Sequence, residues 1–154
     1  MNRPLLAVFL LAAAPARAQT PGCTYDTCAL RLHTRFWSGV SLVQGQDARR
    51  VARLGLFAPH IDQLASGSDS TKAHYLTFRS KQNTGGALLL IGAVFAGVVG
   101  GLAYDEAHYR DHEGLVLGFA VTSLVFSIWG GAKQVSAQDH LQQAIWFYNR
   151  DLGR

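Results

Sequence analysis

Two long apolar runs dominate the second half of the chain. Residues 85–104 and 114–132 contain no charged side chain. A helix of about 20 residues rises about 30 Å, which matches the hydrocarbon thickness of a bilayer. The rest of the chain is too small to bury two such helices on every side. The pattern therefore predicts two transmembrane helices, and the short acidic loop 105–113 between them makes them an antiparallel hairpin.

The segment before the apolar runs has the two-residue period of β-strands. Leu30, Leu32 and Thr34 alternate with basic side chains. Turn signals follow at Ser38-Gly39 and at residues 45–47. We therefore predict a β-meander over residues 19–57, in which "ARRVARLG" fits either a third strand or a short helix.

Helical segments are expected on both sides of the hairpin. Residues 58–84 are predicted to form a helical linker, and residues 83–86, "NTGG", are expected to break or bend the chain. Residues 133–154 predict an amphipathic helix that either lies on the membrane or covers the β-meander. The predicted fold class is membrane α+β: a two-helix transmembrane hairpin with a small β-rich N-terminal segment and a C-terminal amphipathic helix.

The N-terminus has the pattern of a secretory signal. Arg3 precedes a short apolar stretch, and Ala16-Arg17-Ala18 has the small-x-small form of a cleavage site. We predict a signal peptide over residues 1–18, cleaved before Gln19, and hence an exported protein. An uncleaved N-terminal anchor and a lipoprotein with its lipid on Cys23 are the alternatives.

Export indicates a role for the two cysteines. Four residues separate Cys23 from Cys28, and such a segment can form a turn that brings the Cα atoms into disulfide range. We expect a structural disulfide that stiffens the start of the folded region. A redox pair would need two intervening residues, and a metal site would need more ligands than the nearby His33.

Glycine is concentrated around the apolar runs, since ten of the 16 glycines lie in residues 85–131. Small residues recur at four-residue spacing on each predicted span, and helices in lipid associate through such faces because their backbones approach closely. The predicted helix-packing residues are Ala93, Gly97, Gly101, Gly114, Gly118, Thr122, Ser127 and Gly131. These faces meet either each other or a second copy of the chain.

Charge narrows the function classes. Without the two arginines of the predicted signal, 12 basic and 10 acidic residues remain, and this net charge of +2 is too small to favour nucleic acid. Basic side chains concentrate between residues 29 and 57, at Arg31, Arg35, Arg49, Arg50 and Arg53. They suit either an anionic membrane surface or a solvated face of the sheet.

Candidate catalytic chemistry is sparse. The sequence contains no nucleophile-elbow or phosphate-loop motif, so we predict neither an enzyme nor a cofactor. The lack of charge within the spans argues against a transporter or proton path. His108 and His112 are four residues apart among acidic side chains, a spacing that suits zinc or copper. A solvated acidic loop is the alternative.

Two predictions of orientation disagree. A cleaved signal places loop 105–113 in the cytoplasm and both soluble segments in the periplasm. Basic residues usually concentrate on the cytoplasmic side, yet here the flanks of the spans hold more of them than the loop, which has only Arg110. Because the cleavage site is the stronger feature, we expect an inner-membrane protein with periplasmic soluble segments. The outer membrane is the alternative location.

The glycine-rich residues 85–131 resemble the glycine-zipper hairpins of some envelope proteins. The order of parts, from "CALRL" through two spans to "AIWFYNRDL", is similar to that of small uncharacterised exported two-span membrane proteins of diderm bacteria, and this resemblance implies no activity. We expect a non-catalytic, membrane-anchored envelope protein that acts through protein contacts or self-association. An oligomeric pore or assembly former and a metal-responsive loop protein are the alternatives.

Overall fold

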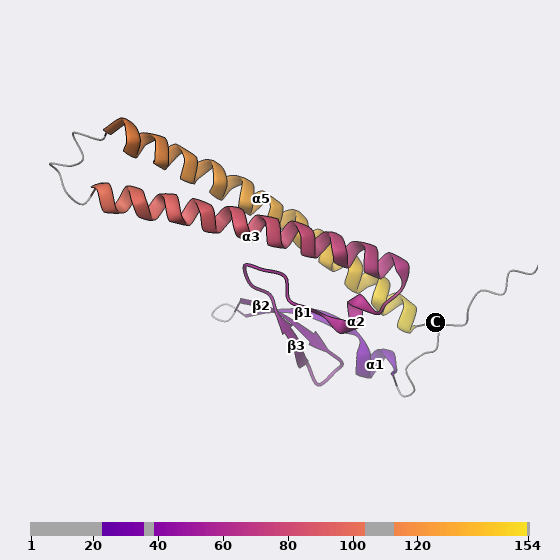
Figure 1. The fold of residues 1–154 in the computed structure, drawn as a ribbon. Helices are drawn as coiled ribbons and strands as arrows, with labels where there is room; N and C mark the ends of the chain where they lie inside the picture. The colour runs from indigo at the N-terminus through magenta and orange to yellow at the C-terminus, as the bar shows by residue number, and fades with distance from the viewer. Residues whose placement is uncertain (1–22, 36–38, 104–112, 154) are drawn as a thin grey trace, which may run out of the picture.

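The computed structural model describes residues 23–35, 39–103 and 113–153. Its elements are α1 (Tyr25–Cys28), β1 (Leu30–Arg35), β2 (Gly39–Gln44), β3 (Arg49–Arg53), α2 (Asp62–Ala65), α3 (Asp69–Ala103) and α5 (Glu113–Leu152). Helices α3 and α5 run side by side, and the sheet and α2 lie along one end of the pair (Figure 1). The other end projects beyond them, so the molecule has an α+β part and a bare helical part.

The predicted β-meander is confirmed as an antiparallel sheet in the order β1-β2-β3. Leu30 pairs with Gln44 at one end of the β1–β2 ladder, and β3 pairs with β2, which decides the open question about "ARRVARLG" in favour of a strand. The turn between β2 and β3 needs left-handed backbone, which Gly45 adopts at φ 68° and Ala48 at φ 50°.

The hydrophobic core lies where the sheet meets the polar ends of the two long helices. Tyr75 and Phe78 of α3 and Leu141 of α5 are buried against the inner face of the sheet. The Tyr75 hydroxyl accepts a hydrogen bond from the Ile61 N–H (2.7 Å) and donates one to the Pro59 carbonyl (3.0 Å), which fixes the segment before α2. Of the two predicted places for residues 133–154, the structure shows the one that covers the β-meander.

The expected break at residues 83–86 is wrong. Helix α3 continues through "NTGG", so the predicted linker helix and the first apolar run form one helix of 35 residues. Helix α5 similarly joins the second apolar run to the amphipathic segment in one helix of 40 residues. A glycine lowers helix propensity by only about 1 kcal/mol, and tertiary packing of the buried Gly85 and Gly86 outweighs that cost.

Candidate functional site

The projecting half of the helix pair exposes its apolar side chains. Their exposed fractions run from 39% to 66% at Leu90, Ile91, Val94, Val98, Leu115, Leu117, Val121, Leu124, Val125 and Ile128. Both helices are long and apolar enough to cross a membrane. In an apolar 18-residue stretch of each helix, 11% is buried, whereas a core helix of a soluble protein is mostly buried. We call this surface, residues 87–103 and 114–132, the apolar sleeve.

Within the helix pair, α3 and α5 touch through small residues that are mostly not the predicted ones. A Cβ added at Gly85 would lie 2.9 Å from the Gly130 carbonyl oxygen, and one added at Gly92 would lie 2.9 Å from Ser127 Oγ. The Ser123 hydroxyl donates a hydrogen bond to the Gly92 carbonyl (2.9 Å). Of the predicted helix-packing residues, Ser127 therefore lies at this contact.

Most of the predicted small-residue face stays open. Among the described residues, no atom lies within 4 Å of a Cβ added at Gly97, Gly101, Gly114, Gly118 or Gly131. Ala93 is exposed, and the Thr122 hydroxyl donates to the Gly118 carbonyl (2.8 Å) within its own helix. Within the described residues, the two predicted faces thus make no close contact with each other. The glycines of α3 that do approach α5 closely, Gly85 and Gly92, are seven residues apart. Contact residues recur at this spacing where two helices pack along their length.

Three amide side chains bind residues 55–58 to the helix pair at the end of the sleeve. Gln82 Nε2 donates to the Gly55 carbonyl (2.6 Å). Gln134 Nε2 donates to the carbonyl of the following residue, Leu56 (3.0 Å). Asn83 Oδ1 accepts the backbone N–H at residue 58 (2.9 Å). A Cβ at Gly86 would clash with the backbone of this segment, so glycine lets the segment approach the helix.

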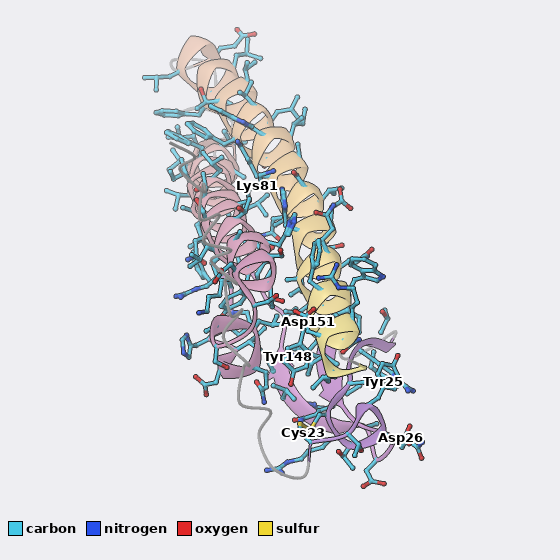
Figure 2. All side chains as sticks on the ribbon, turned by 90° about the vertical axis from the view of Figure 1, so that its right-hand side faces the viewer. Cys23, Tyr25, Asp26, Lys81, Tyr148 and Asp151 are labelled. Carbon is cyan, nitrogen blue, oxygen red and sulfur yellow. A yellow bond between two sulfur atoms is a disulfide. The ribbon has the colours of Figure 1, made fainter. Side chains whose placement is uncertain are left out.

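A second polar cluster lies between α3 and α5, beyond the end of the sleeve that is nearer the sheet (Figure 2). Lys81 Nζ donates to Ser136 Oγ (2.8 Å) and lies 2.9 Å from His140 Nε2, while His140 Nδ1 lies 3.3 Å from His74 Nδ1. A charged ammonium only donates, so His140 Nε2 accepts, and its Nδ1 carries the proton that is donated to His74. We call these four residues the lysine–histidine cluster.

The electrostatics of this cluster favour a neutral His140. Burial lowers the pKa of its imidazole, and the Lys81 ammonium and His74 lower it further, while Asp139 acts in the opposite direction. In the described part of the chain, no group of three or more His, Cys, Asp or Glu side chains is placed to hold a metal ion. The predicted metal candidates His108 and His112 lie outside the described residues.

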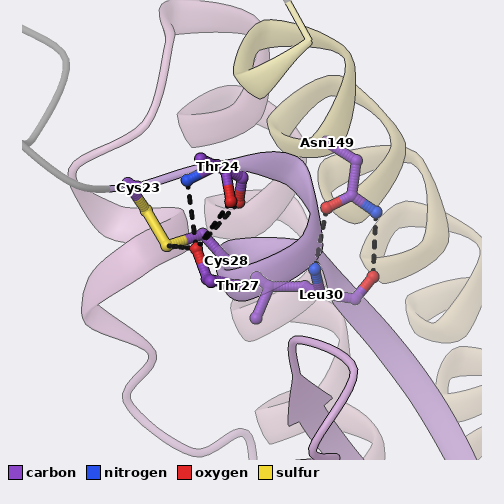
Figure 3. Close-up of a disulfide and its surroundings, with 6 residues drawn as sticks. All are labelled: Cys23, Thr24, Thr27, Cys28, Leu30 and Asn149. Atoms are coloured by element: carbon purple, nitrogen blue, oxygen red, sulfur yellow. Dashed lines mark hydrogen bonds between the residues drawn. A yellow bond between two sulfur atoms is a disulfide. The ribbon is translucent and has the colours of Figure 1, made fainter.

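The predicted disulfide between Cys23 and Cys28 is present, with Cα atoms 5.6 Å apart (Figure 3). Beside it, Asn149 of α5 donates from Nδ2 to the Leu30 carbonyl (2.8 Å) and accepts the Leu30 N–H at Oδ1 (2.8 Å). The disulfide-linked start of the sheet is therefore bound to the last turns of α5. Sequence reasoning did not identify Asn149.

Three arginines of the sheet share one face, and Arg49, which pairs with Gln44, lies on the other. Arg31 and Arg50 both pair with Val43, and Arg53 pairs with Ser41, so these arginines share the outer side of the sheet. A register shift beside Val43 makes this possible, because it adds one residue to β3 between Arg50 and Arg53. Arg31, Arg49, Arg50 and Arg53 are exposed, and the Arg35 side chain lies outside the described residues.

Comparison with known proteins adds no assignment to these features. No protein-family model, no curated protein and no solved structure matches the chain.

Proposed function

We propose that the chain is a non-catalytic, membrane-anchored protein of the bacterial cell envelope. In this proposal the apolar sleeve crosses the bilayer and carries a small folded head, residues 23–84 and 133–153. The head acts through protein contacts or self-association. The observation that carries the proposal is the continuous, charge-free and exposed sleeve, which joins the head through both helices without a linker.

The dimensions of the sleeve support a bilayer as its solvent. Its two helical segments rise about 25–29 Å, close to the 30 Å of a typical hydrocarbon core. Soluble monomers rarely expose contiguous apolar surface of this extent. At the head end of the sleeve, Trp129 is 55% exposed and Phe57 is 48% exposed beside Gly86. The amphipathic ring of tryptophan prefers this level, where hydrocarbon meets headgroups.

Charged substitutions in the sleeve test the proposal. The double variant Val94→Lys/Val121→Lys replaces side chains that are 66% and 61% exposed. We expect it to leave the membrane fraction in alkaline carbonate extraction, because each lysine at a span centre costs roughly 2.5–3.5 kcal/mol. Leu76→Lys is the matched control: Leu76 is 60% exposed but lies on the head part of α3, so this variant should stay in the membrane. The proposal is contradicted if the double variant stays in the membrane together with the wild type and Leu76→Lys, or if carbonate releases the wild type.

The orientation is proposed from the signal peptide: head in the periplasm, loop 105–113 in the cytoplasm, hairpin in the inner membrane. A single cysteine at Tyr109, with the native pair kept as a disulfide, should resist an impermeant thiol reagent until the inner membrane is broken. Labelling after only the outer membrane is opened would mean that the loop faces out, so that either the signal is not cleaved as proposed or the hairpin has left the inner membrane.

A second function, assembly of several copies into an oligomer or pore, is favoured by the open small-residue face. Gly97 and Gly101 belong to this face, and a Cβ added at either would have no described atom within 4 Å. We expect Gly97→Leu/Gly101→Leu to weaken a chemically crosslinked oligomer, because close helix approach needs small residues. Gly100→Leu, one position off the face, serves as control. Unchanged crosslinking of the double variant rejects this function.

The metal-responsive loop remains a third hypothesis. Calorimetry with zinc on the wild type and on His108→Ala tests it. Binding that the substitution abolishes supports a loop site, and no binding by the wild type ends the idea.

A further inference from the structure

A column of polar residues begins at the end of the apolar sleeve. On α5, Trp129, Lys133, Ser136 and His140 follow one another at spacings of four, three and four residues, which places them on one face of the helix. Lys81 of α3 joins this column, because its ammonium contacts both Ser136 and His140. The column therefore includes side chains of both helices.

Along this column an aromatic ring comes first and basic and hydroxyl groups follow, just as the acyl chains of a lipid lead to its charged headgroup. Trp129 is 55% exposed at the end of the sleeve. Lys133 lies one helical turn farther toward the head, and the Lys81–Ser136 contact comes next. Tryptophan rings prefer the boundary between acyl chains and headgroups, and basic pockets between membrane helices bind anionic headgroups.

The column is electropositive. Within the described ranges, no carboxylate forms an ion pair with Lys81 or Lys133. The positive field of Lys81 reaches His140, where it lowers the pKa of the imidazole. Asp139 is the acidic group whose field opposes it there. Ser136 Oγ accepts its hydrogen bond from Lys81, so its own hydroxyl proton is free to be donated.

We infer that Lys81, Lys133 and Ser136, beside the ring of Trp129, bind the phosphate of an anionic lipid headgroup. Two ammonium groups supply the charge, the hydroxyl donates a hydrogen bond, and the indole packs against the lipid below its phosphate. This inference rests on the proposed membrane function and adds a lipid class to it. The arginines on the outer face of the sheet do not belong to this column, because that face is turned away from the helix pair.

Lipid retention in nanodiscs tests this site. The full chain is reconstituted in mixed phosphatidylglycerol and phosphatidylcholine, and the lipids that stay bound are counted by native mass spectrometry. We expect the wild type to retain phosphatidylglycerol selectively. Lys81→Gln/Lys133→Gln should lower this selectivity about thirtyfold, since each lysine near an anionic surface contributes about fivefold. Arg49→Gln/Arg50→Gln removes the same charge from the exposed sheet and should leave the selectivity unchanged.

Each other outcome overturns the inference in a distinguishable way. If the wild type and the lysine variant select phosphatidylglycerol equally, the proposed site does not exist. If the arginine variant loses as much selectivity as the lysine variant, only the net charge of the protein matters. Displacement of phosphatidylglycerol by millimolar inorganic phosphate assigns the column to free phosphate instead of a lipid. A wild type that does not enter nanodiscs overturns the membrane function as well. If the double variant unfolds, Lys133→Gln alone carries the test, with an expected loss of about fivefold.

Discussion

At the scale of single residues, side-chain amides hold the sheet and the segment after it against the helix pair. Asn149 pairs with both backbone groups of Leu30, as a neighbouring strand would. Gln82 and Gln134 bind consecutive carbonyl groups of the segment after β3. These bonds satisfy backbone groups that the sheet leaves without strand partners, so we expect their loss to be costly.

Asn149→Ala should lower the free energy of unfolding by about 1–3 kcal/mol, because it leaves both polar groups of the buried Leu30 without partners. Thermal unfolding of the detergent-solubilised protein measures the change. Gln142→Ala, an exposed position on the same helix, is the control and should change stability by less than about 0.5 kcal/mol. Equal losses in the two variants would show that the Asn149 bonds contribute nothing.

The protonation of His140 should make stability depend on pH. Burial, Lys81 and His74 lower its pKa below the ordinary value of 6.5, so the unfolded chain takes up this proton at a higher pH than the folded chain. The contribution of His140 is therefore complete above about pH 6.5 and decreases as the pH falls from there toward the folded pKa.

Unfolding of the wild type and of Lys81→Gln between pH 5 and 8 measures this effect. Removal of the ammonium should raise the pKa of His140 and make the loss of stability at low pH smaller. Gln142→Ala, which removes no titratable group from the same helix, should leave the pH dependence as it is in the wild type. An unchanged pH dependence in Lys81→Gln would contradict the assignment.

Residue-scale contacts were the hardest to predict from the sequence. The disulfide was predicted because two cysteines in an exported chain have few other roles. Asn149, Gln82 and Gln134 were not, because an amide on a helix has the same local pattern whether it faces water or a backbone from a distant segment. Only the packing of the sheet onto the helices decides which backbone each amide meets.

At the scale of elements, the two charge-free apolar runs predicted the helical spans, and the two-residue period predicted the sheet. It failed at residues 83–86, where glycine propensity alone indicates a break. Gly85 and Gly86 instead provide close contacts, one with α5 and one with the segment after β3. The same reasoning missed the contact face of the hairpin, since the seven-residue repeat of Gly85 and Gly92 coexists with a more obvious four-residue repeat.

The two glycine faces should respond differently to substitution. Gly85→Leu or Gly130→Leu forces a side chain against the facing backbone and should destabilise the detergent-solubilised monomer by at least about 1–3 kcal/mol. Gly97→Leu should not destabilise it, because a Cβ there meets open space. Thermal unfolding compares the three variants. Destabilisation by Gly97→Leu to the same degree would mean that the four-residue face also packs within the monomer.

At the scale of the whole molecule, the head is assembled from both ends of the described chain. Its core joins residues 30–78 to residues 137–145, and the sleeve interrupts it in sequence without contributing to that cluster. The order of segments was predictable, whereas this interleaved construction was not, because it depends on which elements pack together.

A chain in which residues 93–126 are replaced by a short Gly/Ser loop should keep a folded head. The core residues Tyr75, Phe78 and Leu141 and the contact of Gly85 with Gly130 all lie outside the replaced segment. We expect this chain to be recovered without detergent and to unfold cooperatively in circular dichroism. Non-cooperative unfolding would show that the head needs the hairpin in order to fold.

Helices α3 and α5 run without interruption from the sleeve into the head, so in the proposed membrane arrangement the head would be a rigid extension of the spans. Spans longer than the local hydrocarbon thickness tilt to match it. The polar part of α5 is about 30 Å long, so a tilt of about 10° would move its far end sideways by about 5 Å. Fluorescence energy transfer from a dye near Asn149 to labelled lipid, in bilayers of different acyl length, would follow this motion, and an unvarying signal would argue against it. In the proposed membrane arrangement such a chain would work as a lever, which converts the thickness of the bilayer into a displacement of the disulfide end.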